Sequence, residues 1–239
     1  MNSNSKLIST IRLFRTAPHP CSYRQGEQAA TVFVDPEIKV NQALNSKLSE
    51  LGYRRSGAHL YRPDCDNCNA CISCRIPVNV FQPRRRHRKI WQINQDLTVT
   101  RLEKLDGADI YALYKRYINT RHSDGDMYPA TPEQFDAFIK TRTSDTRYYG
   151  FYFDQLLVAV SVTDVLEQGL SAVYTFFDPS MLKRSLGNFV ILWQVKKALQ
   201  LKLPYLFLGY WINDCPKMQY KSTFRPIEML FEGKWVLLN

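Results

Sequence analysis

The chain has 239 residues, 45% of them hydrophobic and 13% aromatic, and it carries a formal net charge of +10 with a pI near 9.3. This apolar content supports a buried core and excludes an intrinsically disordered chain. The first residues interrupt their apolar run with Lys6, Arg12 and Arg15, which argues against a secretory signal, and no later run is long enough to span a bilayer. We therefore expect a cytoplasmic globular protein whose positive charge favours an anionic partner, nucleic acid above all.

The first part of the chain predicts short strands around one helix. The segment "ATVFVDP" is typical of a strand that ends at Pro36. In "NQALNSKLSELGY", Leu44, Leu48 and Leu51 recur at helical spacing, and Gly52 closes the helix. "YRRSGAHLYRP" then predicts a turn and a strand.

Four of the six cysteines stand at three-residue steps in "PDCDNCNACISCRIP". The steps resemble the iron–sulfur run of bacterial ferredoxins, whereas a zinc site normally separates its two cysteine pairs by a longer loop. Cys21 is a remote candidate in another proline-rich turn. Reduced thiols that merely pack are the alternative, because a cytoplasmic location disfavours disulfides and the nearby Asp64 and Asp66 lower thiol reactivity. The candidate metal ligands, for iron–sulfur or zinc, are Cys21, Cys65, Cys68, Cys71 and Cys74.

A dense positive run follows the cysteines in "VNVFQPRRRHRKIWQINQDL". Such charges neutralise a phosphate backbone, and an aromatic neighbour such as Trp91 stacks on an unpaired base. A solvated loop is the alternative, but the net charge of the chain favours nucleic-acid binding. The candidate contacts are Arg84, Arg85, Arg86, Arg88 and Lys89.

A second lobe is predicted from Asp96 onward, which divides the chain into residues 1–95 and 96–239. It begins with two helical segments, "LDGADIYALYKRYINTRH" and "TPEQFDAFIKT", of which the second opens with a threonine cap and a proline. The runs "YYGFYFDQLLVAVSVTDVL" and "GLSAVYTFFDP" predict antiparallel strands. A helix in "LGNFVILWQVKKALQLKL" and a buried strand in "PYLFLGYW" complete the lobe.

This order of elements is similar to that of the GNAT acyltransferases. We therefore expect an α+β protein with a GNAT-like lobe and a smaller, cysteine-bearing N-terminal α+β lobe. The loop "KRSLGNF" opens a helix, and the backbone N–H groups of a helix N-terminus beside Arg184 suit an anion. A single glycine in such a loop is more often a packing or turn residue.

Nine segments, in order along the chain, carry a family resemblance: "HPCSY", "VFVDP", "RRSGAHLYRPDCDNC", "CRIPV", "YINTRHSDGDM", "VTDVLEQGLSAVYTFFDP", "RSLGNFVILWQ", "YLFLGYWI" and "KMQYK". Together they resemble the bacterial branch of the arginyl-tRNA-protein transferase family, the aspartate/glutamate leucyltransferases. The resemblance implies transfer of leucine from leucyl-tRNA to proteins that begin with Asp or Glu, which marks them for degradation by the N-end rule pathway. Arginine as the donated residue is the alternative. Eukaryotic relatives hold an iron–sulfur cluster with paired cysteines, and here Cys21 matches while its partner position is Arg24.

The implied reaction is attack of an α-amine on an aminoacyl ester. Because that amine has a pKa of about 7.7 to 8, positioning and oxyanion stabilisation suffice, and no cofactor or covalent nucleophile is required. Cys215 has no evident base beside it and is expected to pack. Asp164 and Tyr174 lie near the middle of adjacent predicted strands and either orient or deprotonate the amine or form structural hydrogen bonds. The candidate substrate-binding residues are Arg184, Ser185 and Gly187 for the tRNA terminus, and Lys217, Tyr220, Lys221, Arg121 and His122 around the acceptor.

Two rival functions remain open from the sequence. An acetyltransferase that uses acetyl-CoA shares the fold but normally has a loop richer in glycine than "RSLGNF", and it leaves the positive charge unexplained. A non-catalytic nucleic-acid-binding sensor built on the cysteines predicts normal function after Asp164→Asn.

Overall fold

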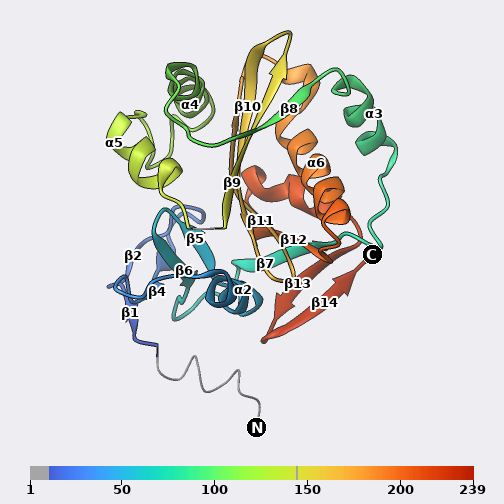
Figure 1. The fold of residues 1–239 in the computed structure, drawn as a ribbon. Coiled ribbons are helices and arrows are strands. Elements are labelled where there is room, and N and C mark those ends of the chain that lie inside the picture. Colours follow the sequence, from blue (N-terminus) through green and yellow to red (C-terminus); the bar gives the residue numbers. More distant parts are fainter. Residues whose placement is uncertain (1–10, 144) are drawn as a thin grey trace.

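The computed structural model describes residues 11–143 and 145–239, and an eight-stranded mixed sheet forms its centre (Figure 1). The strands run in the order β14 (Lys234–Leu238), β13 (Ile227–Phe231), β7 (Ile72–Pro77), β12 (Tyr205–Trp211), β11 (Gly169–Phe177), β10 (Leu156–Val165), β9 (Thr146–Phe153) and β8 (Thr98–Leu102). Every neighbouring pair is antiparallel except β11 and β12, which are parallel. A parallel pair needs a crossover connection, and helix α6 (Leu186–Gln200) supplies it.

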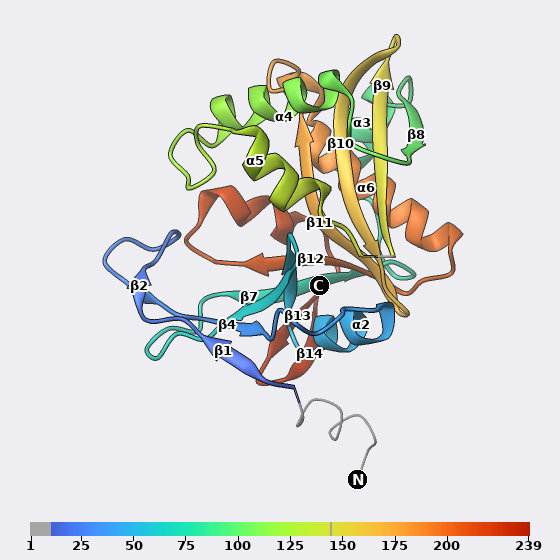
Figure 2. The same ribbon diagram turned by 60° about the vertical axis from the view of Figure 1, so that its left-hand side comes forward.

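Helices cover both faces of this sheet (Figures 1 and 2). One core lies under α6 and α3 (Arg85–Ile93), and it contains Phe189, Val190 and Phe151. The other core lies under α4 (Ala108–Arg121), α5 (Pro132–Phe135) and the π-helical turn η1 (Asp136–Lys140). The two short 3-10 elements are η2 (Leu182–Arg184) and η3 (Pro216–Thr223). No helix in the described ranges is both long enough and apolar enough to cross a bilayer.

The N-terminal part folds around a second, four-stranded sheet. Its order is β1 (Leu13–Arg15), β4 (Thr31–Val34), β6 (His59–Pro63) and β5 (Arg54–Ser56), with a separate pair β2 (His19–Pro20) and β3 (Gln28–Ala29). Helix α2 (Gln42–Glu50) buries Leu44 and Leu48 against this sheet, as its spacing predicts. The side chain of Asn41 caps it by accepting from the amide of Leu44 at 2.9 Å.

Most predicted elements are present, with three differences. The run from Tyr148 to Leu166 is two strands, because Asp154 and Gln155 adopt positive φ angles and turn the chain between β9 and β10. The basic run, for which a loop was one alternative, is helix α3. Strand β7 and helix α3 precede residue 96 but pack with the large sheet, so the predicted boundary at residue 95 does not coincide with a division between the sheets.

Candidate active site

The two parallel strands part along their length and leave an opening in the large sheet. Their pairing runs from Gly169 opposite Tyr205 to Ser171 opposite Phe207 and then ends, although both strands continue. On the other side of β12, the register with β7 shifts between Phe207 and Gly209, and such irregularities in strand pairing often occur beside functional sites. We call this opening the strand gap.

The side chain of Arg54 reaches the strand gap from the N-terminal sheet. It belongs to β5 in the N-terminal sheet, and its guanidinium donates to carbonyls on both parted strands. Nη2 donates to the carbonyls of Val173 at 2.7 Å and Ala172 at 3.4 Å, and Nη1 donates to that of Leu208 at 3.3 Å. Gly209 makes room for it: φ is +73° there, and a Cβ would lie 1.7 Å from Arg54 Nη1. The sequence analysis did not identify Arg54.

Lys221 lies under the same gap. It is 4% exposed, and its Nζ donates to the carbonyl of Tyr210 on β12. Burial lowers the pKa of the Lys221 ammonium to about 8; Arg54 lowers this pKa too, while Cys74 and Cys215 act in the opposite sense. The sequence analysis predicted Lys221 as a substrate contact. In the structure its buried ammonium instead contacts the backbone of β12.

Arg54 influences the pKa of four tyrosines, Tyr23, Tyr174, Tyr210 and Tyr220, and the last three belong to or follow the parted strands. Burial is the main cause that raises the pKa of Tyr174 well above its usual value, and desolvation raises that of Tyr220 to about 12. The pKa of Tyr210 rises for the same reason, and its hydroxyl donates to the carbonyl of Gly52 at 2.8 Å. These phenols are therefore hydrogen-bond donors near neutral pH and not bases. The Tyr174 hydroxyl has only a weak contact, 3.8 Å from the sulfur of Met127.

Asp164 is fully enclosed, which favours structural hydrogen bonds, the alternative to its predicted catalytic role. Its Oδ2 accepts from Arg55 Nε at 2.6 Å and from Asn45 at 3.3 Å, and its Oδ1 accepts from Arg55 Nη2 at 2.9 Å and from Thr146 at 2.7 Å. The side chains of Arg55 and Asp164 are only 2% and 1% exposed. With both oxygens occupied and almost no exposure, the carboxylate is placed as the structural alternative expects, and its catalytic role stays a prediction.

The loop before α6 uses its polar groups within the protein. Arg184 forms a two-bond ion pair with Asp96, at 2.8 and 2.9 Å, and donates to the carbonyl of Ile93. A Cβ on Gly187 would lie 3.0 Å from the ring of Phe177, so packing explains this glycine. The backbone of Ser185 adopts the left-handed helical conformation, with φ at +49°. The predicted role of Arg184, Ser185 and Gly187 in holding the tRNA terminus stays a prediction.

The polar residues after α4 form a small cluster of their own. Lys217 pairs with Asp124 at 2.7 Å, and the ring of His122 hydrogen-bonds to the Tyr117 hydroxyl at 3.1 Å. Burial lowers the pKa of His122, and Lys217 and Arg121 lower it further, so the ring is neutral. Tyr117 in turn contributes to the raised pKa values of Tyr174 and Tyr220, which brings this cluster to the rim of the strand gap.

Helix α3 presents its charges to solvent. Arg84, Arg85, Arg86, Arg88 and Lys89 are all exposed, while His87 and Ile90 face inward. Cations at a helix N-terminus oppose the helix dipole, so the charges of Arg84, Arg85 and Arg86 do not serve the stability of α3. Beside the helix lies a largely apolar groove of about 440 Å³ between α3 and α6, lined by Phe81, Trp91 and Leu192 among others.

The cysteines divide into two groups. Cys74 on β7 is buried, and its sulfur lies 3.3 Å from the carbonyl of Gly209, so the prediction that it joins the other cysteines is wrong. The pKa of Cys71 rises to about 12, chiefly through burial and then through Cys21, Cys65 and Cys68, which lie near it. Within the described residues, no three His, Cys, Asp or Glu side chains are arranged to hold a metal ion. An iron–sulfur or zinc site at Cys21, Cys65, Cys68 and Cys71 therefore stays a prediction.

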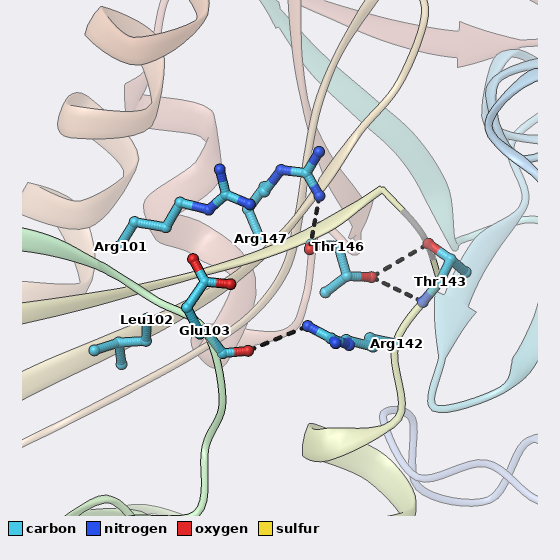
Figure 3. Close-up of a pocket in the computed structure, with 7 residues that line it drawn as sticks. All are labelled: Arg101, Leu102, Glu103, Arg142, Thr143, Thr146 and Arg147. Carbon is cyan, nitrogen blue, oxygen red and sulfur yellow. Dashed lines mark hydrogen bonds between the residues drawn. The ribbon is translucent and has the colours of Figure 1, made fainter.

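A positively charged hollow of about 340 Å³ lies at the β8–β9 edge of the large sheet (Figure 3). Arg101, Arg142 and Arg147 line it together with Glu103. Arg142 donates to the carbonyl of Glu103 at 3.2 Å, and Arg147 to that of Thr146 at 3.2 Å. The sequence analysis missed this hollow because its arginines lie far apart in the chain.

Family models and relatives match nearly the whole chain. The model of the arginine-tRNA-protein transferase C terminus matches residues 109–231, and that of the N terminus matches residues 19–89. The chain belongs to this family. An aspartate/glutamate leucyltransferase of Alcanivorax borkumensis is 54% identical over 228 residues, which are 95% of this chain and 94% of that protein. One of Pseudomonas fluorescens is 47% identical over 232 residues, 97% of this chain and 99% of the relative. The predicted family resemblance is confirmed.

The fold has a solved counterpart outside the arginine-tRNA-protein transferases. The crystal structure of FemX matches with a TM-score of 0.52 at 7% identity, and the match covers 95% of this chain and 88% of FemX. At that identity the likeness concerns the fold alone. Together with the crossover helix α6 between β11 and β12, it confirms the predicted α+β, GNAT-like fold class.

Proposed function

We propose that this chain transfers leucine from leucyl-tRNA to the N-terminal amine of proteins that begin with Asp or Glu. The observation that carries this proposal is the 54% identity to an aspartate/glutamate leucyltransferase across 95% of the chain. The strand gap supports it, because it combines cationic side chains with protonated phenols. Such products would enter the N-end rule pathway of protein degradation, and the place of action would be the cytoplasm.

The chemistry needs positioning and charge more than a nucleophile on the enzyme. The acceptor nitrogen attacks the ester carbonyl carbon, a C–N bond forms, and the C–O bond to the ribose breaks. The nitrogen loses a proton, and the ribose oxygen gains one. A neutral amine with a pKa of about 7.7 to 8 is available at cytoplasmic pH, so orientation against the ester supplies much of the rate.

The residues of the strand gap suit the remaining steps. Tyr174 and Tyr220 keep their protons, so their hydroxyls can donate to the oxyanion or to the leaving ribose oxygen. Lys221 supplies positive charge from behind β12, in a buried setting where charge acts strongly. No resident cofactor is required by these steps.

A transfer assay tests the proposed function. We expect the protein, incubated with a pool of charged tRNAs, to add one leucyl residue to peptides that begin with Asp or Glu and nothing to peptides that begin with Arg or Ala. Mass spectrometry of the peptides identifies the donated residue. If arginine is added instead, arginine and not leucine is the donated residue. Acetylation from acetyl-CoA without aminoacyl transfer would refute the proposal.

The exposed cations of α3 are proposed to contact the tRNA backbone. We expect Arg84→Ala/Arg85→Ala/Arg86→Ala to weaken tRNA binding and to reduce the slope of log Kd against log salt by about 2, since each lost phosphate contact removes roughly 0.7 to 0.9. Thermal stability should not fall, because cations at a helix N-terminus are unfavourable. Filter binding at several salt concentrations measures the slope.

A charge-matched variant controls for the loss of three positive charges. Lys39→Ala/Lys47→Ala/Lys234→Ala removes the same charge from other elements and should leave the slope nearly unchanged. Equal slopes for both triple variants would show that α3 makes no specific contact.

A further inference from the structure

Arg54 and Lys221 are the basis of this inference because, in the part of the chain that the structure describes, neither forms an ion pair. Three other arginines, whose side chains are 2%, 6% and 18% exposed, are by contrast paired with carboxylates: Arg55 with Asp164 at 2.6 Å, Arg75 with Glu50 at 2.6 Å and Glu228 at 2.7 Å, and Arg184 with Asp96 at 2.8 Å. In residues 11–143 and 145–239, no carboxylate forms an ion pair with Arg54 or Lys221.

The partners of these two cations are main-chain carbonyls. Arg54 donates to the carbonyls of Ala172, Val173 and Leu208, and Lys221 donates to that of Tyr210. Carbonyls satisfy hydrogen bonds but carry no net charge, so the strand gap holds two positive charges that nothing in the described chain neutralises. Burying unpaired charge is costly, and a bound anion would offset that cost.

The guanidinium of Arg54 is also available to a ligand. Its three bonds come from Nη1 and Nη2, which leaves at least the Nε–H and one Nη1–H without a partner in the described residues. The residue is partly exposed, unlike Arg55 beside it. Gly209 lacks the Cβ that would displace it, so the backbone of β12 is shaped around this one side chain.

We propose that Arg54 binds the side-chain carboxylate of the acceptor's N-terminal Asp or Glu, with the charge of Lys221 reinforcing the site. This inference rests on the proposed leucyl transfer. A carboxylate is favoured over an RNA phosphate because Arg54 is only partly exposed and is close enough to Tyr174, Tyr210 and Tyr220 to influence the pKa of each, so a short side chain reaches it more readily than a polynucleotide backbone does. The exposed cations of α3, and Arg101 and Arg142 at the β8–β9 hollow, are open to a bulky polyanion instead.

The test compares acceptor peptides that begin with Asp and with Asn, which differ in charge but hardly in size. For Arg54→Gln, we expect the ratio of kcat/KM for Asp over Asn to fall by about 10²-fold, the loss typical of removing one partner of a buried charge pair. Arg54→Lys should keep part of the preference, because it keeps the charge. KM for leucyl-tRNA should not change. A general loss of folding lowers kcat/KM for both peptides by the same factor and leaves their ratio unchanged.

Two further arms keep the inference testable if these variants fold poorly. Gly209→Ala retains both charges but displaces the guanidinium, so it should lower the same ratio. In the wild-type protein, a peptide that begins with Asp should protect Arg54 from phenylglyoxal, read by peptide mapping, whereas the Asn peptide should not.

Other outcomes overturn the inference in distinct ways. An unchanged Asp/Asn ratio in folded Arg54→Gln, or no protection of Arg54 by the Asp peptide, refutes it. Protection by uncharged tRNA, with a raised KM for leucyl-tRNA in the variants, would assign the site to an RNA phosphate. If the wild-type protein transfers no leucine at all, the proposed function itself fails, and that assay is therefore run first.

Discussion

Asp164→Asn should lower the free energy of unfolding by about 3–5 kcal/mol, because it leaves the charge of Arg55 buried without its partner. The carboxylate accepts four hydrogen bonds, two of them from Arg55, and both side chains are almost inaccessible to solvent. Activity per folded molecule should remain near that of the wild type, since no atom of Asp164 reaches the strand gap. Urea unfolding followed by linear extrapolation measures the first quantity, and the transfer assay measures the second.

An exposed ion pair provides the matched control. Asp136 pairs with Lys140 at 2.8 Å, with side chains 60% and 34% exposed, so Asp136→Asn should cost at most about 1 kcal/mol. A variant Asp164→Asn that unfolds like the wild type but has lost its activity would restore the catalytic role that the sequence predicted.

Elements with strong periodicity could be predicted from the sequence, whereas contacts between distant segments could not. Helices α4 and α6 and strand β12 follow from apolar spacing, and Thr131 with Pro132 marks the start of α5. Helix α3 was harder, because only His87 and Ile90 are fully buried and charged residues dominate its first half. Cys74 was grouped with the other cysteines by spacing, but strand β7 carries it into the core.

The adjacent residues Arg54 and Arg55 show why the site itself was only partly predictable. Successive residues of a strand point to opposite faces, so Arg55 reaches Asp164 while Arg54 reaches the strand gap. The carbonyl partners of Arg54 lie more than a hundred residues away and have no side-chain signature that a sequence could reveal. Tyr174, Tyr220 and Lys221 were found because a family motif or a strand pattern pointed to them, although not to their arrangement around Arg54.

Lys221→Met should lower kcat by about 10²-fold at neutral pH, as expected for the loss of a charge that stabilises a developing oxyanion. Stability should change little, because the variant removes a buried charge but also leaves the carbonyl of Tyr210 without its donor. Lys234→Met, on an exposed edge strand, is the control and should match the wild type. Single-turnover transfer at saturating peptide separates this effect on the chemical step from one on binding.

The pH dependence identifies the protonation state that acts. Because the pKa of Lys221 is lowered to about 8 by burial, the wild-type residue loses its charge as the pH rises through that value. The rate ratio of wild type to Lys221→Met should therefore fall toward one above pH 8, and titration of the acceptor amine cancels in this ratio. A ratio that rises instead would show that the neutral amine of Lys221 acts as a base.

The stability of the folded protein should depend on the same titration of Lys221, but it should rise with pH where the rate advantage of the wild type falls. The folded-state pKa of Lys221 lies below its unfolded value of 10.5, so between about pH 8 and 10.5 the unfolded state binds more protons and stability rises with pH. Below pH 8 both states hold the proton, and the full cost of burying the charge is present. The wild type should thus gain stability relative to Lys221→Met as the pH is raised from 8 to 10, which urea unfolding at several pH values would measure. A charge that is placed for chemistry is expected to cost stability when it is buried at neutral pH and yet to accelerate transfer. A difference in the free energy of unfolding between the two proteins that stays constant from pH 8 to 10 would contradict this.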